Sequence, residues 1–305
     1  MNAHVKSALL LVSTIFFAAL VIVLAKVSLT RIPVFTFNWL QIAVAALFLL
    51  CYTFVWRREP WPRHLTLRQW LYPIAIGIAN FTLVRYLLLA GLDYLPVTTH
   101  AYLVNFVGLI TMGLSIFMLN ERPYLLQLIG ALIALSGLTI YFEVLPQAEE
   151  IKGIALVATG VFFLALTNNL IRRFMLGHSE ALSAVMLSTL AIVIGGLPLI
   201  IWGMISDGVI FKFALYDWLV IFANGIIGLA LTLIVFNHVM KTLRSYEASI
   251  LASMGVVFVG VLAIPIAGEQ LTFNKIVGIA ILLLGILLSQ LKITLKPSDK
   301  SQENL

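Results

Sequence analysis

An arginine inside an apolar stretch is the residue of this sequence best suited to bind a charged solute. Arg85 lies toward the C-terminal end of an apolar segment that we expect over residues 70–90. Ionisable groups are costly at bilayer depth and usually serve a function there. A guanidinium that faces a cavity binds a carboxylate or phosphate through its planar fork of donors. We therefore predict that Arg85 binds an anionic solute group; the alternative is that it extends to the interface or pairs with an acid such as Asp93.

Uncharged polar side chains in the first half of the chain could extend this site. Asn80 is about 140° from Arg85 around a regular α-helix, so both could line one wide cavity. Thr98, Tyr102 and Asn105 follow the helical spacing i, i+4, i+7, which predicts a polar stripe on an apolar helix. Such a stripe is equally typical of hydrogen bonds between helices.

The second half of the chain contributes three further candidates. Ser253 occupies the position equivalent to Asn105 in an internal repeat described below. Asn168 and Asn169 are adjacent and cannot share a helix face, so one should pack against a neighbouring helix. We assign the other, Asn169, to the cavity, together with Asn224. The predicted substrate-binding residues are therefore Arg85, Asn80, Tyr102, Asn105, Asn169, Asn224 and Ser253.

The composition excludes several classes of protein. Of the 305 residues, 62% are apolar and 10% charged, against roughly 45–50% and about 25% in soluble domains, so the chain is a polytopic membrane protein. Its one cysteine and five scattered histidines predict no metal site, and we expect no cofactor. A phosphate-binding glycine loop and the common hydrolase motifs are missing, so we expect no enzyme. The net charge is +6, but the sequence has no patch of basic residues interleaved with aromatic ones. The lack of such a patch argues against nucleic acid as a partner.

Ten segments are long and apolar enough to cross a bilayer as helices, which predicts an all-α polytopic membrane protein. Lys and Arg are concentrated in the connections on the side of the N-terminus, which favours both termini in the cytoplasm. Residues 293–305 are polar and are expected to form a disordered cytoplasmic tail. The ten segments cover roughly residues 7–26, 34–56, 70–90, 97–119, 124–142, 152–172, 181–204, 216–238, 246–266 and 272–292.

An internal duplication divides the chain into two halves, 1–145 and 146–292. Residues of distinctive type recur at an offset of about 146–148 positions. Each half contains five spans, an odd number, so the second half must enter the membrane from the opposite face. Inverted repeats of this kind recur in secondary transporters, with the solute site between them. Matching pairs include Lys6 and Lys152, Trp70 and Trp218, Gly77 and Gly225, Glu121 and Glu269.

The end of each half resembles a known family. Glu121-Arg122-Pro123 is followed by Gly130 and Gly137, and Gly268-Glu269-Gln270-Leu271-Thr272 by Gly278 and Gly285. This pattern resembles the end of the EamA repeat, and the whole chain is similar to the ten-helix branch of the drug/metabolite transporter superfamily. The resemblance implies a multi-pass protein of the bacterial cytoplasmic (inner) membrane. It also implies a central cavity formed mainly by the first, third, fourth, sixth, eighth and ninth spans.

The residues of this motif have a structural interpretation of their own. Glycines seven residues apart line one helix face and allow close backbone approach. A carboxylate just before a helix accepts unpaired backbone N–H groups and complements the helix dipole. We therefore expect Glu121 and Glu269 to stabilise the scaffold, and helix capping for Glu247 at the start of the ninth span.

These observations predict a secondary transporter that works by alternating access. The preferred solute is an amino acid or a related carboxylate-bearing metabolite. The resemblance to the drug/metabolite transporters favours export as the direction of transport. The alternative is an exporter of hydrophobic or cationic toxic compounds; a channel or an intramembrane enzyme is less favoured. No acidic residue lies deep in a span, which weakens a proton-for-cation mechanism. The expected partners are a small-molecule solute and the lipid bilayer. The sequence does not decide whether transport is coupled to a proton or a counter-solute, or whether the protein is a monomer or a dimer.

Overall fold

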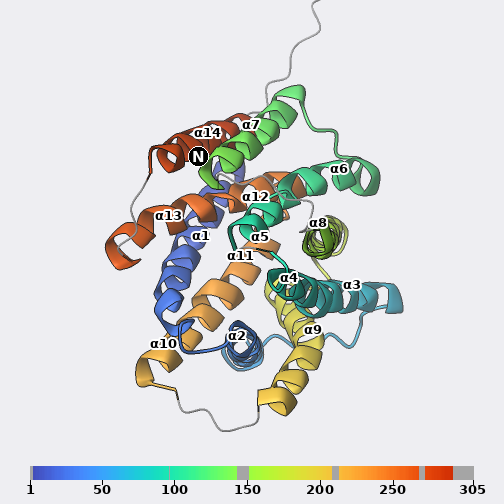
Figure 1. Ribbon diagram of the computed structural model, residues 1–305. Coiled ribbons are helices and arrows are strands. Elements are labelled where there is room, and N and C mark those ends of the chain that lie inside the picture. Colours follow the sequence, from blue (N-terminus) through green and yellow to red (C-terminus); the bar gives the residue numbers. More distant parts are fainter. Residues whose placement is uncertain (1–2, 96, 143–150, 208–212, 268–271, 291–305) are drawn as a thin grey trace, which may run out of the picture.

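The computed structural model describes residues 3–95, 97–142, 151–207, 213–267 and 272–290, and this part of the chain is entirely helical apart from short connections (Figure 1). Nine helical segments are long and apolar enough to span a membrane, and the shorter apolar helix Leu125–Tyr141 makes a tenth. The ten expected helical segments are therefore confirmed, nine of them as candidate membrane spans in the described part of the chain, with ends that differ from the expected ones by a few residues.

The first five spans comprise nine helical pieces. Short turns join consecutive spans, so neighbours in sequence cross the membrane in opposite directions. The pieces are α1 (Ala3–Ser28); α2 (Val34–Leu50) with the π-helix η1 (Cys51–Trp56); α3 (Leu67–Gly77), the π-helix η2 (Ile78–Val84) and α4 (Arg85–Leu92); α5 (Val97–Val104) and α6 (Val107–Leu119); and α7 (Leu125–Phe142).

The second five spans repeat this plan. They are α8 (Ile151–Gly177); α9 (Ala184–Asp207); α10 (Leu215–Ala223), the π-helix η4 (Asn224–Leu231) and α11 (Thr232–Val239); α12 (Ser245–Ala252) and α13 (Met254–Ala267); and α14 (Phe273–Gln290). We call the membrane face at which α1 begins the N-terminal face, and the opposite one the distal face.

Two irregularities of the helices recur in the two halves. A π-helix interrupts the third span at η2 and the eighth at η4. The fourth span breaks between α5 and α6, beside Asn105, and the ninth breaks between α12 and α13, at Ser253. Irregular backbone at membrane depth persists only where protein or a cavity surrounds it. Its recurrence at equivalent positions indicates two copies of one packing solution and agrees with the duplicated fold expected from the sequence.

The glycines of the repeat motif lie where two helices touch. α7 and α14 run side by side (Figure 1), and their backbones meet at Gly137 and Gly285. A Cβ atom on Gly285 would overlap the backbone nitrogen of Ala134, and one on Gly137 would overlap that of Leu282. Only glycine permits this approach, which confirms the predicted role of the motif glycines in helix packing.

Candidate substrate cavity

Two adjoining chambers lie among the helices of the two halves. The distal chamber, of about 390 Å³, is lined by α2, the third span and α8, with His100 of α5 and Leu29 from the turn after α1. The central chamber, of about 210 Å³, lies between the third span and α8, η4, α11 and α12. Asn80, Arg85 and Leu164 line both chambers, so the two chambers lie directly beside each other.

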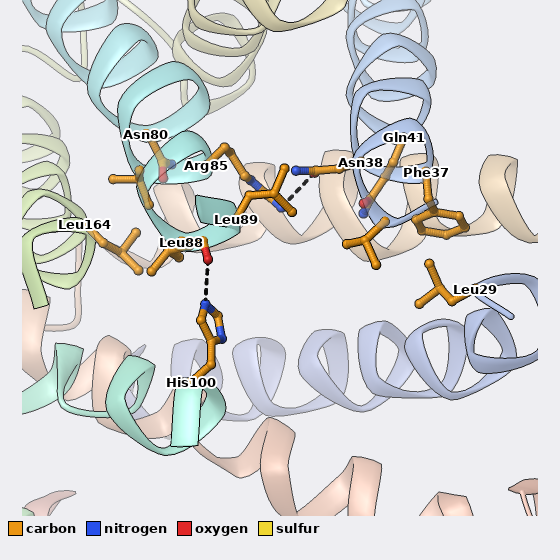
Figure 2. A pocket seen from close by; sticks show the side chains of 12 residues that line it. Leu29, Phe37, Asn38, Gln41, Asn80, Arg85, Leu88, Leu89, His100 and Leu164 are labelled. Carbon is orange, nitrogen blue, oxygen red and sulfur yellow. Dashed lines mark hydrogen bonds between the residues drawn. The ribbon is translucent and has the colours of Figure 1, made fainter. Parts of the chain in front are cut away.

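Arg85 is the only ionisable side chain apart from His100 that lines either chamber in the described part of the chain. It is half-buried, and its Nη1 donates a hydrogen bond to Asn38 Oδ1 over 3.2 Å (Figure 2). No carboxylate among the described residues lies within 4.0 Å of its guanidinium, and Asp93 is exposed elsewhere. The positive charge at the chamber wall is therefore not neutralised by an acid among the described residues.

The π-helix η2 places Asn80 near Arg85. On a regular α-helix the two side chains would diverge by about 140°. A π-helix instead bonds residue i to residue i+5 and holds more residues per turn, so residues five apart diverge much less than they do on an α-helix. Asn80 lies within η2 and Arg85 follows it directly, and both line both chambers. Asn80 makes no hydrogen bond within the described residues, which leaves its amide available to a solute.

The adjacent asparagines of α8 divide their roles, but in the reverse of the predicted order. Asn169 is fully buried: its Nδ2 donates to Thr111 O over 3.1 Å, and its Oδ1 accepts from Ser245 Oγ over 2.6 Å. Asn168 lines the central chamber instead, and its Nδ2 donates to Ser249 Oγ over 3.0 Å. The assignment of Asn169 to the cavity is therefore corrected, because helical periodicity separates the two faces without saying which one meets the cavity.

Asn224 also has a packing role. Its Nδ2 donates to Val21 O over 2.8 Å and to Val220 O over 3.0 Å, and the side chain is buried between α1 and η4. Only its backbone carbonyl is turned toward the chamber lining, where it accepts a hydrogen bond from Gln41 Nε2 over 3.3 Å. The structure thus adds two residues of α2, Asn38 and Gln41, to the chamber wall. In the sequence, the only indication of a role in the cavity is that these two amide side chains lie close together near the start of the second span.

The remaining predicted residues lie at helix breaks and not among those that line the two chambers. Tyr102 OH hydrogen-bonds with Thr139 Oγ1 of α7 over 3.1 Å. At the break after α5 the backbone N–H of Asn105 bonds to Tyr102 O, which leaves Ala101 O without its helical partner. The Asn105 side chain supplies that partner over 2.8 Å. Ser253 is buried at the equivalent break, and the side chain of Thr98 lies outside the described residues.

Buried polar contacts close the chambers on the N-terminal face. Arg172 Nε of α8 bonds to Glu121 Oε1 over 3.0 Å, and both side chains are about nine-tenths buried. Arg172 Nη1 also donates to Met240 O over 2.5 Å. Nearby, Glu247 is fully buried and accepts from Gln127 Nε2 over 3.1 Å and from Arg244 N over 3.0 Å. The contact with Arg244 N is the expected helix cap, whereas Glu121, in the connection between α6 and α7, pairs with Arg172 of α8. Glu269 lies outside the described residues.

The two asparagines of α8 should respond differently to substitution. Asn169→Ala is expected to lower the unfolding free energy by about 1–3 kcal/mol, because Ser245 Oγ and Thr111 O lose a buried partner. Asn168→Ala should cost less, because Ser249 Oγ keeps Ser245 O as its acceptor, and should instead weaken solute binding. Thermal unfolding of both variants in detergent measures the difference. Equal losses of stability would contradict these assignments.

Ten spans around a polar, arginine-bearing space define a multi-pass membrane transporter, and comparison with known proteins identifies its family. The sequence profile of the EamA-like transporter family matches residues 5–142 and again residues 151–291. The chain therefore belongs to the EamA-like transporter family, within the drug/metabolite transporter superfamily, and it is a transporter and not an enzyme. The two matches account for the duplicated architecture.

Two individual proteins illustrate the similarity. An "Uncharacterized transporter in sor 3'region" of Acidianus ambivalens is 26% identical over 240 residues, which cover 79% of this chain and 90% of the relative. A solved structure titled "Crystal structure of protein" superposes with a TM-score of 0.79 over 94% of this chain and 98% of its own, at 16% identity. At that identity the second comparison supports the fold alone.

Proposed function

We propose that this transporter moves a small carboxylate-bearing metabolite, such as an amino acid, with its carboxylate bound at Arg85. The observation that carries this proposal is the guanidinium at the junction of the two chambers, which has no carboxylate partner among the described residues. A desolvated anion would gain charge-assisted hydrogen bonds there, which are about twice as strong as neutral ones. A cationic solute would meet repulsion from the same group.

The remainder of the chamber wall suits the other parts of such a solute. The amides of Asn80, Gln41 and Asn168 offer donors and acceptors, whereas Phe37 and Phe236 supply apolar surface. The arrangement thus combines a few placed polar groups with a mainly apolar wall, which is typical of small-molecule sites.

We further propose that the protein works by alternating access between the two halves, as an exporter in a cytoplasmic membrane with both termini in the cytoplasm. The excess of Lys and Arg on the N-terminal face supports this orientation. The buried contacts of Arg172 and Glu247 on that face support a state in which the chambers are closed toward it.

Counterflow in proteoliposomes tests the proposal. Vesicles are loaded with one unlabelled solute, and uptake of the same labelled solute is followed for a panel of L-amino acids, keto acids and hydroxy acids. A carrier accelerates labelled uptake when unlabelled solute is inside, which a channel does not do. If tetraphenylphosphonium shows counterflow and no carboxylate does, the proposed substrate class is wrong and the export of toxic cations takes its place.

A further inference from the structure

A third cavity, which we call the lateral groove, lies beside the distal chamber between α4 and α9. It has a volume of about 770 Å³ and mostly apolar walls, including Phe35, Pro198 and Trp202. Asp93 and Ser206 stand where α4 and α9 end. Trp202 is 64% exposed and Tyr86 58%, and both belong to membrane-spanning segments. The groove therefore opens sideways toward the hydrocarbon of the bilayer.

The packing of α9 explains why the groove exists. α9 packs closely on α3 and η2, where a Cβ atom on Gly195 would overlap the backbone of Gly77. Thr82 Oγ1 donates to Gly195 O over 2.6 Å, which holds the two spans together at that level. Beyond this bond α4 and α9 diverge toward the distal face, where Pro198 interrupts the hydrogen bonding of α9. The divergence leaves the groove between them.

The groove and the distal chamber lie directly beside each other. Leu89 and Val34 line both spaces, whereas Arg85 faces the chamber and Ala90 faces the groove. Leu89 lies four residues, about 6 Å along the helix axis, beyond Arg85. A chain that extends past Leu89 from an anion at Arg85 therefore enters the groove. No charged side chain lies between the two spaces among the described lining residues.

We propose that the lateral groove is the subsite for the hydrocarbon part of an amphipathic carboxylate, whose anion lies at Arg85 and whose chain crosses Leu89. This inference rests on the proposed function and narrows its substrate class to carboxylates with an extended apolar side chain. It also makes the gap between α4 and α9 a lateral route by which such a solute exchanges with the bilayer. The groove shares Leu89 and Val34 with the arginine-bearing chamber, and this proximity to Arg85 favours a solute over a membrane lipid as its occupant.

Binding of unbranched carboxylates of increasing length tests the subsite. The protein is placed in lipid nanodiscs, and equilibrium binding of radiolabelled butanoate, hexanoate, octanoate and decanoate is measured, with empty nanodiscs subtracted. In the parent protein, Kd should fall about threefold to fourfold for each methylene that reaches the groove. Ala90→Trp fills the groove without entering the chambers, so it should leave butanoate binding unchanged and abolish the dependence on length.

Two further variants act as controls. Ala75→Trp makes the same substitution at an exposed alanine of α3 outside the chambers and the groove, and it should bind the series as the parent does. Trp202→Ala removes one wall of the groove and should reduce the gain per methylene, which provides a second readout if Ala90→Trp does not fold. The inference would be overturned if the Kd of the parent protein did not depend on the length of the carboxylate. It would also be overturned if Ala90→Trp kept the same dependence on length.

The outcomes for the groove and for the proposed function are separable. Arg85→Gln should weaken binding of all four carboxylates by one common factor if the anion lies at Arg85. If it has no effect while the length dependence remains, the proposed function fails and the apolar subsite stands. If the series shows no length dependence and brominated phospholipid quenches the fluorescence of the parent more than that of Trp202→Phe, a lipid fills the groove and the inference is wrong.

Discussion

Arg85→Gln is expected to weaken carboxylate binding by about 10-fold to 150-fold while the protein stays folded. A hydrogen bond to a charged group contributes about 1.5–3 kcal/mol, and each 1.4 kcal/mol is tenfold in Kd. Glutamine keeps a donor and much of the length of arginine, so the variant removes the charge and the bidentate fork. Only Asn38 loses a partner within the described residues, so the unfolding temperature should change little. The measurement is the Kd of the best counterflow substrate in detergent.

Matched variants separate the charge of Arg85 from its shape. Arg85→Lys retains the charge without the fork and should bind with intermediate affinity. Arg173→Gln makes the same charge change at an exposed position of α8 and should leave Kd unaltered. The carboxamide analogue of the solute carries no charge, so parent and Arg85→Gln should bind it almost equally. A loss of affinity for the carboxamide as large as that for the carboxylate would rule out an electrostatic role.

Glu121→Gln is expected to open the N-terminal face. Removing one partner of a buried ion pair costs roughly 3–5 kcal/mol, because it leaves the other charge buried without compensation. Arg172 would be that charge, and opening the face would hydrate it. We therefore expect a cysteine placed just behind the pair to become at least about tenfold more reactive, since even part of this energy shifts a two-state equilibrium by that factor.

Cysteine labelling measures the opening. Met240 is fully buried, and its carbonyl binds Arg172, so Met240→Cys reports directly on this closure; the exposed Cys51 is replaced by serine beforehand. A water-soluble maleimide is used in proteoliposomes. Glu180→Gln is the control, because it makes the same change at an exposed position between α8 and α9. Unchanged labelling of Met240→Cys in the Glu121→Gln background would show that the pair does not hold this face closed.

The spans, the duplication and the motif glycines were predictable because each depends on residue type and spacing along the chain. A helix that crosses a bilayer needs about twenty apolar residues whatever it packs against. Gly137 and Gly285 could be assigned to a helix contact because glycines spaced by seven residues form a surface on which backbones can approach. Arg85 stood out because a charge at membrane depth is rare in itself. The structure places its side chain at the chambers, but its contact with a solute stays a prediction.

The choice among the polar residues depended on the rotation of each helix, which periodicity leaves undetermined. Asn168 and Asn169 differ by about 100° around α8, and only the neighbouring helices decide which of them meets the cavity. Asn105 and Ser253 were correctly related by the repeat, but the helix breaks beside them were not visible in the sequence. At such a break a side chain is used to satisfy the backbone, as Asn105 does for Ala101 O.

The amino-acid sequence by itself determined that this chain is a ten-span membrane transporter built from two related halves, because hydropathy and repetition are properties of the chain alone. The tertiary structure decided what surrounds Arg85: the π-helix that turns Asn80 toward it, the amides of Asn38 and Gln41, and the groove beyond Leu89. Those features arise where helices distant in sequence meet or part, and no local pattern encodes the distance between them.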